Sequence, residues 1–353
     1  MEGNWVVNKV CTIFSYVFYG MEQSKWSELP DLVVIDILKC LKDKDRSSCA
    51  LVCTNWARLF KTPYLWRTRH FDMGGYRIHN NGSRACAFAS MFGKHVRYLS
   101  ISCSHPAQLT TKIFQKAIAD VLGKMCKAKL FEFEIERLEL DRYWKYHTSR
   151  DRLVSCFVRF FKTQQSLIVF DMTTAECNLE GGCRILDTLG NNSGAKIECL
   201  YIEDFFQSRI AVFQTDRYNI AISKFTNIRY IGINYNCLSG EIIQTFSKTL
   251  EGKLEFMNIK VFKNNPHVHR IEGHEWSMLC RKCPRLGITI WFESIGLSTN
   301  IIPILAKEIP LRDLHIWTGY EDDLEWRLST TLDHIADSFH NSLSEYLLPG
   351  NFS

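Results

Sequence analysis

Histidine and cysteine side chains gather in one short stretch of this 353-residue chain, and their types suggest metal chemistry. A Cys-x-x-Cys pair can supply half of a zinc site, and histidine nitrogens are common zinc ligands. Structural zinc sites usually take their ligands as two tight pairs, however, and these histidines lie in a polar, loop-like stretch. The sequence therefore favours no metal site here. The residues concerned are His267, His269, His274, Cys280 and Cys283.

Motifs of nucleophilic and phosphate chemistry do not occur in the sequence. It has no G-x-S-x-G elbow, no H-E-x-x-H pair and no phosphate-binding glycine-rich loop, and Gly181-Gly182 is typical of a turn. Eleven histidines leave a Cys–His pair open, but no local pattern singles one out. We therefore expect no catalytic residue and no cofactor.

Composition is that of an ordinary globular chain with a small positive charge. The 14 cysteines are scattered, often inside apolar runs, which is typical of reduced thiols in the cytoplasm or nucleus. A net charge of +5 without a long basic run argues against a nucleic-acid partner. The apolar run 5–19 is interrupted by Asn8 and Lys9 and is too short to span a bilayer, so we expect no membrane partner.

Two helices are predicted between Leu29 and Trp66, because apolar residues recur there at helical spacing. The first set is Val34, Ile37, Leu38 and Leu41, and the second is Cys49, Val52, Cys53 and Trp56. A third short helix capped by Thr54 or Asn55 would end before Pro63. So small a unit cannot bury all its apolar surface alone. It must pack either on the rest of this chain or on a partner.

The same stretch resembles an F-box. The family's anchors occur in order, as Leu29-Pro30, Ile37, Leu41, Leu51-Val52-Cys53, Trp56 and Leu65-Trp66. The chain departs from the pattern at Leu32, where the family often has an acidic residue. The resemblance implies that this unit docks on a Skp adaptor. The partner-binding candidates are Leu29, Pro30, Ile37, Leu38, Leu41, Leu51, Val52, Cys53, Trp56, Leu65 and Trp66.

A strand-like triplet recurs beyond Lys94, with apolar residues at its first, fourth and sixth positions. It starts at residues 96, 130, 167, 197, 228, 254 and 311, whereas the run that starts at Leu286 misses the template because Thr289 falls at the fourth position. Helical patterns fill several gaps, at 113–125, 242–250 and 301–305. Strand and helix alternating at a period of about thirty residues indicate a repeat solenoid. An ordinary α/β domain with parallel strands is the alternative.

The repeats resemble irregular leucine-rich repeats. In the best match, Ile228–Leu238, Asn236 stands at the family's asparagine position, which implies that its side chain bonds backbone groups where the chain leaves the strand. Cys283-Pro284-Arg285-Leu286 resembles the connecting segment that often precedes such strands. This gives an explanation other than zinc binding for the Cys280 and Cys283 pair. The tail predicts a closing helix, with helical spacing of Leu324, Leu328, Leu332, Ile335, Phe339 and Leu343.

In leucine-rich solenoids the strands line a concave face. Side chains alternate along a strand, so residues between the buried triplet positions point outward. Here they mix aromatic and polar types, which suits protein recognition, although an exposed face that binds nothing has the same pattern. The target-binding candidates are Tyr201, Glu203, Tyr230, Asn234, Lys260, His315 and Trp317.

The predicted fold class is α/β, with an N-terminal three-helix F-box followed by an irregular leucine-rich-repeat-like α/β solenoid. The predicted parts are an N-terminal extension (1–24), the F-box (25–68), a linker (69–93), the solenoid (94–320) and a C-terminal helical cap (321–353). Among F-box proteins, the chain is similar to F-box only protein 39 and its relatives.

This resemblance implies a non-catalytic substrate-recognition subunit of an SCF-type cullin-RING ubiquitin ligase. The chain would bind the Skp adaptor and, through it, the cullin scaffold, and would hold an unknown target protein for ubiquitination and proteasomal degradation. Two alternatives remain: an F-box adaptor or scaffold that acts outside the ligase, and an unrecognised α/β enzyme. We expect a cytoplasmic or nuclear location.

Overall fold

The chain forms two compact units, Met1–Arg69 and His70–Ser353. This computed structural model describes residues 28–74, 77–103, 111–141, 147–262, 269–293, 301–317, 328–339 and 345–347. The predicted extension 1–24 lies outside these ranges. Within them, no helix combines the length and the apolar character that a membrane span requires.

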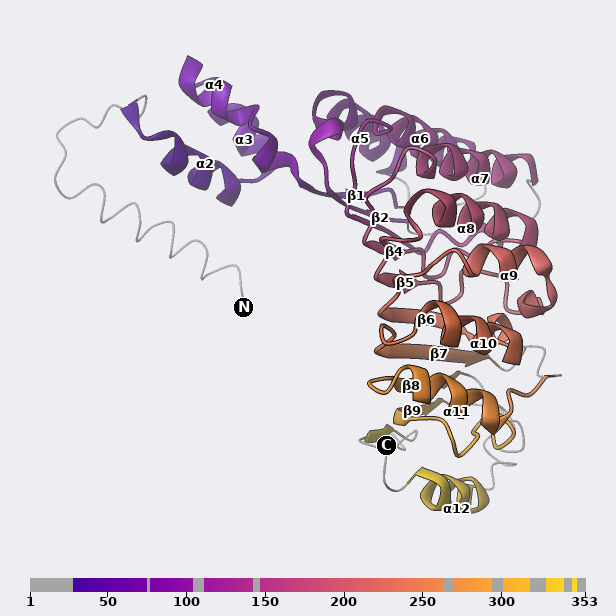
Figure 1. The fold of residues 1–353 in the computed structure, drawn as a ribbon. Coiled ribbons are helices and arrows are strands. Elements are labelled where there is room, and N and C mark those ends of the chain that lie inside the picture. Colours follow the sequence, from indigo (N-terminus) through magenta and orange to yellow (C-terminus); the bar gives the residue numbers. More distant parts are fainter. Residues whose placement is uncertain are drawn as a thin grey trace, which may run out of the picture. The chain divides into compact units, whose positions relative to one another are not determined.

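The described part of the first unit, residues 28–69, contains three short helices and a 3-10 turn: α2 (Asp31–Cys40), α3 (Asp43–Cys49), α4 (Thr54–Phe60) and η2 (Pro63–Trp66) (Figure 1). Pro30 stands at the N-cap of α2, where its missing N–H leaves no hydrogen bond unmade. The helices pack around one small apolar core. Its members are Val34, Leu38, Trp56, Leu59, Leu65 and Trp66.

The predicted second helical stripe is wrong. Helix α3 ends at Cys49, and extended backbone at Cys53 (φ −159°, ψ 168°) precedes α4, so Cys49 and Trp56 lie on different helices. Helix α3 buries none of its residues, because its sequence DKDRSSC is almost entirely polar. The apolar spacing in the sequence thus combined residues of two different helices that a turn separates.

Arg46 on α3 holds this unit together. Its guanidinium donates hydrogen bonds to the carbonyl oxygens of Leu38 (2.7 Å), Lys39 (3.0 Å) and Leu65 (3.3 Å). Two of these carbonyls belong to the last turn of α2, where helical N–H donors run out, although the Leu38 carbonyl also accepts from the Leu41 N–H at 3.3 Å. The same guanidinium lies 5.4 Å from the ring centroid of Trp66. One cation thus joins α2, α3 and η2.

The second unit contains a ten-stranded sheet whose strands are ordered as in the sequence. Every strand pair whose register is resolved is parallel. The strands are β1 (Thr68–Asp72), β2 (Tyr98–Ser102), β3 (Glu132–Glu136), β4 (Val169–Asp171), β5 (Cys199–Tyr201), β6 (Tyr230–Asn234), β7 (Phe256–Phe262), β8 (Gly287–Glu293), β9 (Leu311–Trp317) and β10 (Glu345–Leu347).

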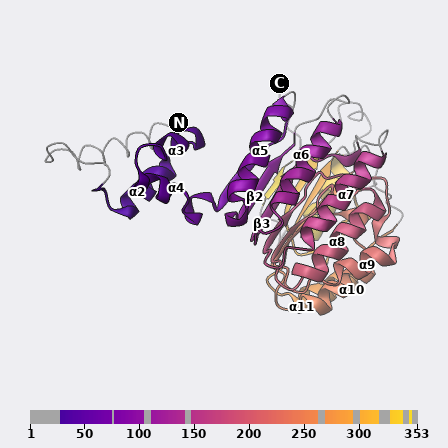
Figure 2. The same cartoon turned by 90° about the horizontal axis from the view of Figure 1, so that it is seen from above.

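Helices connect consecutive strands from β1 to β8 and again β9 to β10, and α5 to α11 lie side by side along one face of the sheet (Figures 1 and 2). The opposite face carries none of these helices. We call it the open face. The helices are α5 (Ile78–Phe92), α6 (Thr111–Lys124), α7 (His147–Phe161), α8 (Leu179–Ser193), α9 (Asp216–Ile222), α10 (Gly240–Thr249), α11 (Gly273–Lys282) and α12 (Leu328–Phe339).

The predicted triplets form the core of this unit. All residues of the seven triplets are buried, and the register aligns Leu99, Phe133, Phe170, Leu200, Ile231 and Met257 in one row across β2 to β7. At β8 this row continues at Ile288, one residue before Thr289. In this shifted frame the eighth repeat fills the fourth and sixth template positions with Ile288 and Ile290, which the sequence prediction missed, but its first position is the exposed Arg285.

The predicted asparagine contact is confirmed. Asn236 is buried, and its Nδ2 donates to the carbonyl oxygen of Ile210 in the preceding repeat at 2.8 Å. Leu238 is buried just beyond it. Together with the parallel order of the strands, this confirms the parallel-strand α/β solenoid.

Three predicted segments need correction. The stretch 69–93 is no linker, because it contains most of β1 and all of α5. Gly181 and Gly182 lie inside α8 rather than in a turn, and a Cβ atom at Gly182 would stand 2.2 Å from Cε1 of Phe206, so this glycine permits close packing. Residues 301–304 form turns, not a helix. The helical tail is confirmed at α12, but β10 then adds a strand beside β9.

Candidate partner-binding surfaces

The first unit exposes large apolar side chains at the start of α2, in the turn before α4 and in η2. We call these residues the docking set. The exposed fraction reaches 76% at Leu32, 87% at Leu51 and 59% at Val52. So much exposed apolar surface on so small a unit marks a candidate protein-binding site. The docking set comprises Leu32, Val33, Leu51, Val52 and Tyr64.

The adaptor-binding residues predicted from the sequence divide into three groups in the structure. Pro30, Leu51 and Val52 are exposed, whereas Leu29, Ile37, Leu41 and Cys53 are half-buried. Leu38, Trp56, Leu65 and Trp66 are buried in the unit's own core, so placing them on a partner surface was wrong. The sequence prediction also left out Leu32, Val33 and Tyr64. Leu32 and Val33 lie outside the first apolar stripe of the sequence, and this position indicated that they face away from the core.

The open face is acidic on the strands β2 to β5. Outward positions there hold carboxylates at Glu132, Glu134, Glu136 and Asp171, and the segment after β5 adds Glu203. No lysine or arginine occupies an outward position of these four strands. Within the described residues, the three glutamates of β3 form no ion pair. This part of the face therefore carries uncompensated negative charge.

A polar network lies at the middle of the open face, over β6 and β7. The Nδ2 of Asn258 donates to Oε1 of Glu203 at 2.9 Å, and this carboxylate covers Gly232, where a Cβ atom would stand 2.0 Å from Oε1. The Oε2 of Glu203 and the Oδ1 of Asn258 are buried and accept no hydrogen bond from described residues. Burial raises the pKa of Glu203 and of Asp171 above their usual range.

Lys260 carries a positive charge in this region, and two carboxylates already neutralise it. Its Nζ lies 2.8 Å from Oδ2 of Asp204 and 2.6 Å from Oε2 of Glu293. Burial lowers the pKa of Lys260, but the two carboxylates outweigh burial and raise it overall. Asn234, a predicted target contact, is 3% exposed, and its Nδ2 donates to Oδ1 of Asp204. Its assignment to the binding surface was therefore wrong.

Aromatic side chains cover the far part of the open face, on β8 and β9. The Trp291 and His315 rings stack with centroids 3.7 Å apart and planes at 13°, and Trp317 is 66% exposed. The other predicted target contacts, Tyr201 and Tyr230, are half-buried on β5 and β6. The structure thus brings the predicted set onto one sheet face, with Trp317 as its most accessible member.

The raised pKa of Glu203 predicts a pH-dependent stability difference between wild type and Glu203→Gln. A carboxyl whose folded pKa exceeds its usual 4.5 stabilises the folded state below pH 4.5, and this contribution is lost as pH rises through the folded pKa. We therefore expect Glu203→Gln to be more stable than wild type at pH 7. The difference should shrink on acidification, as measured by urea unfolding at several pH values. A pH-independent Glu203→Gln effect would contradict this prediction.

The described cysteines and histidines of the 267–283 stretch make separate packing contacts and do not converge on one site. Cys283 Sγ is 3.2 Å from the Leu250 carbonyl oxygen, and Cys280 Sγ is 3.8 Å from that of Glu308. His269 stacks on Phe213 and Tyr235. His267 lies outside the described residues. In the described part of the chain, no group of three or more His, Cys, Asp or Glu side chains is arranged to hold a metal ion.

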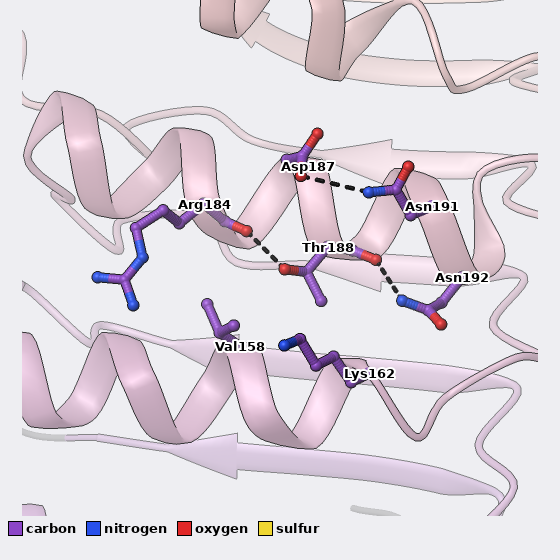
Figure 3. A pocket seen from close by; sticks show the side chains of 7 residues that line it. All are labelled: Val158, Lys162, Arg184, Asp187, Thr188, Asn191 and Asn192. Atoms are coloured by element: carbon purple, nitrogen blue, oxygen red, sulfur yellow. Dashed lines mark hydrogen bonds between the residues drawn. The ribbon is translucent and has the colours of Figure 1, made fainter.

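A hollow of about 350 Å³ lies between α7 and α8 (Figure 3). Four of its side chains are engaged within α8: Asn191 donates to Asp187, Thr188 to the Arg184 carbonyl and Asn192 to the Thr188 carbonyl. Small-molecule sites are mostly apolar with a few free polar groups, so this polar hollow does not resemble one. The lining residues are Val158, Lys162, Arg184, Asp187, Thr188, Asn191 and Asn192.

Comparison with known proteins addresses the first unit directly. Residues 26–72 match the F-box-like family model. The F-box-like domain predicted from the sequence is therefore confirmed, and its helices are those that expose the docking set. The finer resemblance to F-box only protein 39 and its relatives stays a prediction.

Three curated relatives extend this similarity into the solenoid. The chain is 21% identical to F-box/LRR-repeat protein 21 of Mus musculus over 278 residues, which cover 76% of this chain and 59% of that protein. The Ovis aries protein of the same name is 21% identical, covering 93% of this chain and 73% of its own length. The Bos taurus protein is 22% identical, at 88% and 69%. The chain thus spans less than two thirds of the mouse relative.

Proposed function

We propose that this chain is the substrate-recognition subunit of an SCF-type cullin-RING ubiquitin ligase. The docking set on the F-box-like unit binds the Skp adaptor, which connects the chain to the cullin scaffold. The open face of the solenoid holds the target protein. The chain itself performs no chemistry, and its contribution is to keep the target close to the enzyme that transfers ubiquitin. It works in the cytoplasm, the nucleus or both.

One observation carries this proposal: the F-box-like unit exposes its docking set, although both units already have their own cores. Unit one buries Val34 and Leu38 completely, and the sheet unit buries its triplets without residues of the docking set. The exposed Leu51 and Val52 are therefore available to a partner. The F-box-like match and the three F-box/LRR-repeat relatives support the adaptor as that partner.

Co-purification of the tagged full chain with the Skp adaptor and cullin tests the proposal. Leu51→Ala with Val52→Ala should lose adaptor recovery by about tenfold or more, because central apolar contacts dominate such interfaces. Circular dichroism should stay unchanged, since both side chains are exposed. The matched control is Met91→Ala with Ile220→Ala, two exposed apolar residues of the other unit.

Adaptor recovery that survives the Leu51 and Val52 changes, or that falls equally in the control, would refute the docking set. A second measurement separates a ligase receptor from an adaptor that works elsewhere. Reconstituted with adaptor, cullin and conjugating enzyme, the wild-type chain should promote ubiquitin transfer to proteins that co-purify with it. Adaptor binding without any such transfer would refute the receptor role.

A further inference from the structure

The charge on the open face is arranged unevenly, and this indicates what it binds. Strands β2 to β5 present Glu132, Glu134, Glu136 and Asp171 without a basic residue at an outward position. On β6 to β9 the cation Lys260 is held between Asp204 and Glu293. A ligand on the acidic half must therefore bring its own positive charge.

Two hydrogen-bond acceptors at the centre of the face receive no hydrogen bond from the described residues. Oε2 of Glu203 and Oδ1 of Asn258 are buried without a partner among the described residues, and an unmet buried acceptor costs free energy. The ammonium of lysine and the guanidinium of arginine carry several donors and no acceptor. A cationic side chain between these atoms would satisfy both and would return the raised pKa of Glu203 toward its usual range.

The exposed tryptophans fit the same ligand chemistry. Trp291 and Trp317 are 44% and 66% exposed, and tryptophan faces attract lysine and arginine cations. From β3 to β8 the sheet advances by five strand spacings, or about 24 Å. An extended segment of about seven residues covers that distance.

We propose that the open face, from the β3 glutamates to Trp291 and Trp317, binds an extended lysine- and arginine-rich segment of a target protein. That the segment belongs to a target for ubiquitination rests on the ligase role proposed above. Acidic side chains anchor the segment at β3 and β4, the Glu203–Asn258 pair receives one cation at the centre, and the tryptophans receive another at the far end. Phosphate-bearing ligands, such as nucleic acids, are repelled by this face.

Peptide binding to the full chain tests the proposal by fluorescence anisotropy. The probe is a labelled nine-residue peptide of alternating lysine and serine, and its counterpart replaces every lysine with glutamate. We expect the lysine peptide to bind, with an affinity that falls as sodium chloride is added, and the glutamate peptide not to bind. Equal binding of both peptides, or of neither, would overturn the proposal.

Matched charge removals locate the site. The β3 variant should weaken lysine-peptide binding by about tenfold to a hundredfold, since each exposed ionic contact contributes modestly. The helix variant removes the same charge from exposed positions on α6, α7 and α8 and should bind like wild type. The β3 variant is Glu132→Gln, Glu134→Gln and Glu136→Gln, and the helix variant is Asp120→Asn, Asp151→Asn and Glu180→Gln.

Trp317→Ala, at an exposed position, should weaken the lysine peptide about twofold to fivefold. An unchanged β3 variant, or an equal loss in the helix variant, would refute the site. Adaptor recovery measured on the same protein distinguishes the two proposals. Recovery without lysine-peptide binding refutes the cationic segment alone, whereas peptide binding without adaptor recovery refutes the ligase role and leaves the surface in place.

Discussion

Phe133→Ala should destabilise the sheet unit by about 3–5 kcal/mol. Phe133 is completely buried on β3. Its ring centroid lies 5.0 Å from that of Phe161, 6.0 Å from Phe160 and 6.1 Å from Phe170. The substitution therefore removes a side chain from the centre of an aromatic cluster and leaves a cavity.

Urea unfolding monitored by circular dichroism checks this expectation. Phe131→Ala is the matched control, because Phe131 lies two residues earlier and is 38% exposed. It should cost less, about 1–2 kcal/mol, since more than a third of its side-chain surface is already in water. Equal unfolding midpoints for the two variants would contradict the placement of Phe133 in the core.

Trp56→Ala should unfold the F-box-like unit selectively. Trp56 is 5% exposed, and replacing a buried tryptophan by alanine costs about 3–5 kcal/mol. A unit of about forty residues has a total stability of only about 2–6 kcal/mol. The loss is therefore comparable to everything that holds this unit together, and adaptor binding should disappear with the fold.

Hydrogen exchange by mass spectrometry resolves the two units separately. In Trp56→Ala, α2 and α4 should exchange rapidly, while β3 to β9 keep wild-type protection because they belong to the other unit. Tyr64→Ala is the control for hydrogen exchange alone, since Tyr64 is 49% exposed in the same unit but belongs to the docking set. Unchanged protection of α2 and unchanged adaptor recovery in Trp56→Ala would show that its burial contributes little.

The buried rows of the sheet could be predicted because they follow from local sequence. Leu99, Phe133 and Leu200 occupy the same position of a short strand pattern, and alternation along each strand decides which side chains turn inward. The same reasoning failed at Thr289, because a shift of one residue moves every side chain to the other face. Only the pairing of Met257 with Ile288 reveals the correct frame.

The partner surfaces were harder to predict from the sequence. Apolar type alone does not distinguish Trp66, which is buried in its own unit, from Leu51, which faces solvent. The contacts of Arg46 with Leu38 and Leu65 join residues far apart in the chain and have no local signature. The same applies to Glu203 and Asn258, which only the strand order brings together.

The alternation of side chains along the strands has a consequence for how this protein can change over time. Inward residues such as Phe133 carry stability, whereas their neighbours Glu132 and Glu134 contact solvent. A substitution at an outward position therefore needs no compensating change in the packing beneath it. The exposed positions of the open face can therefore diverge one residue at a time while the fold persists.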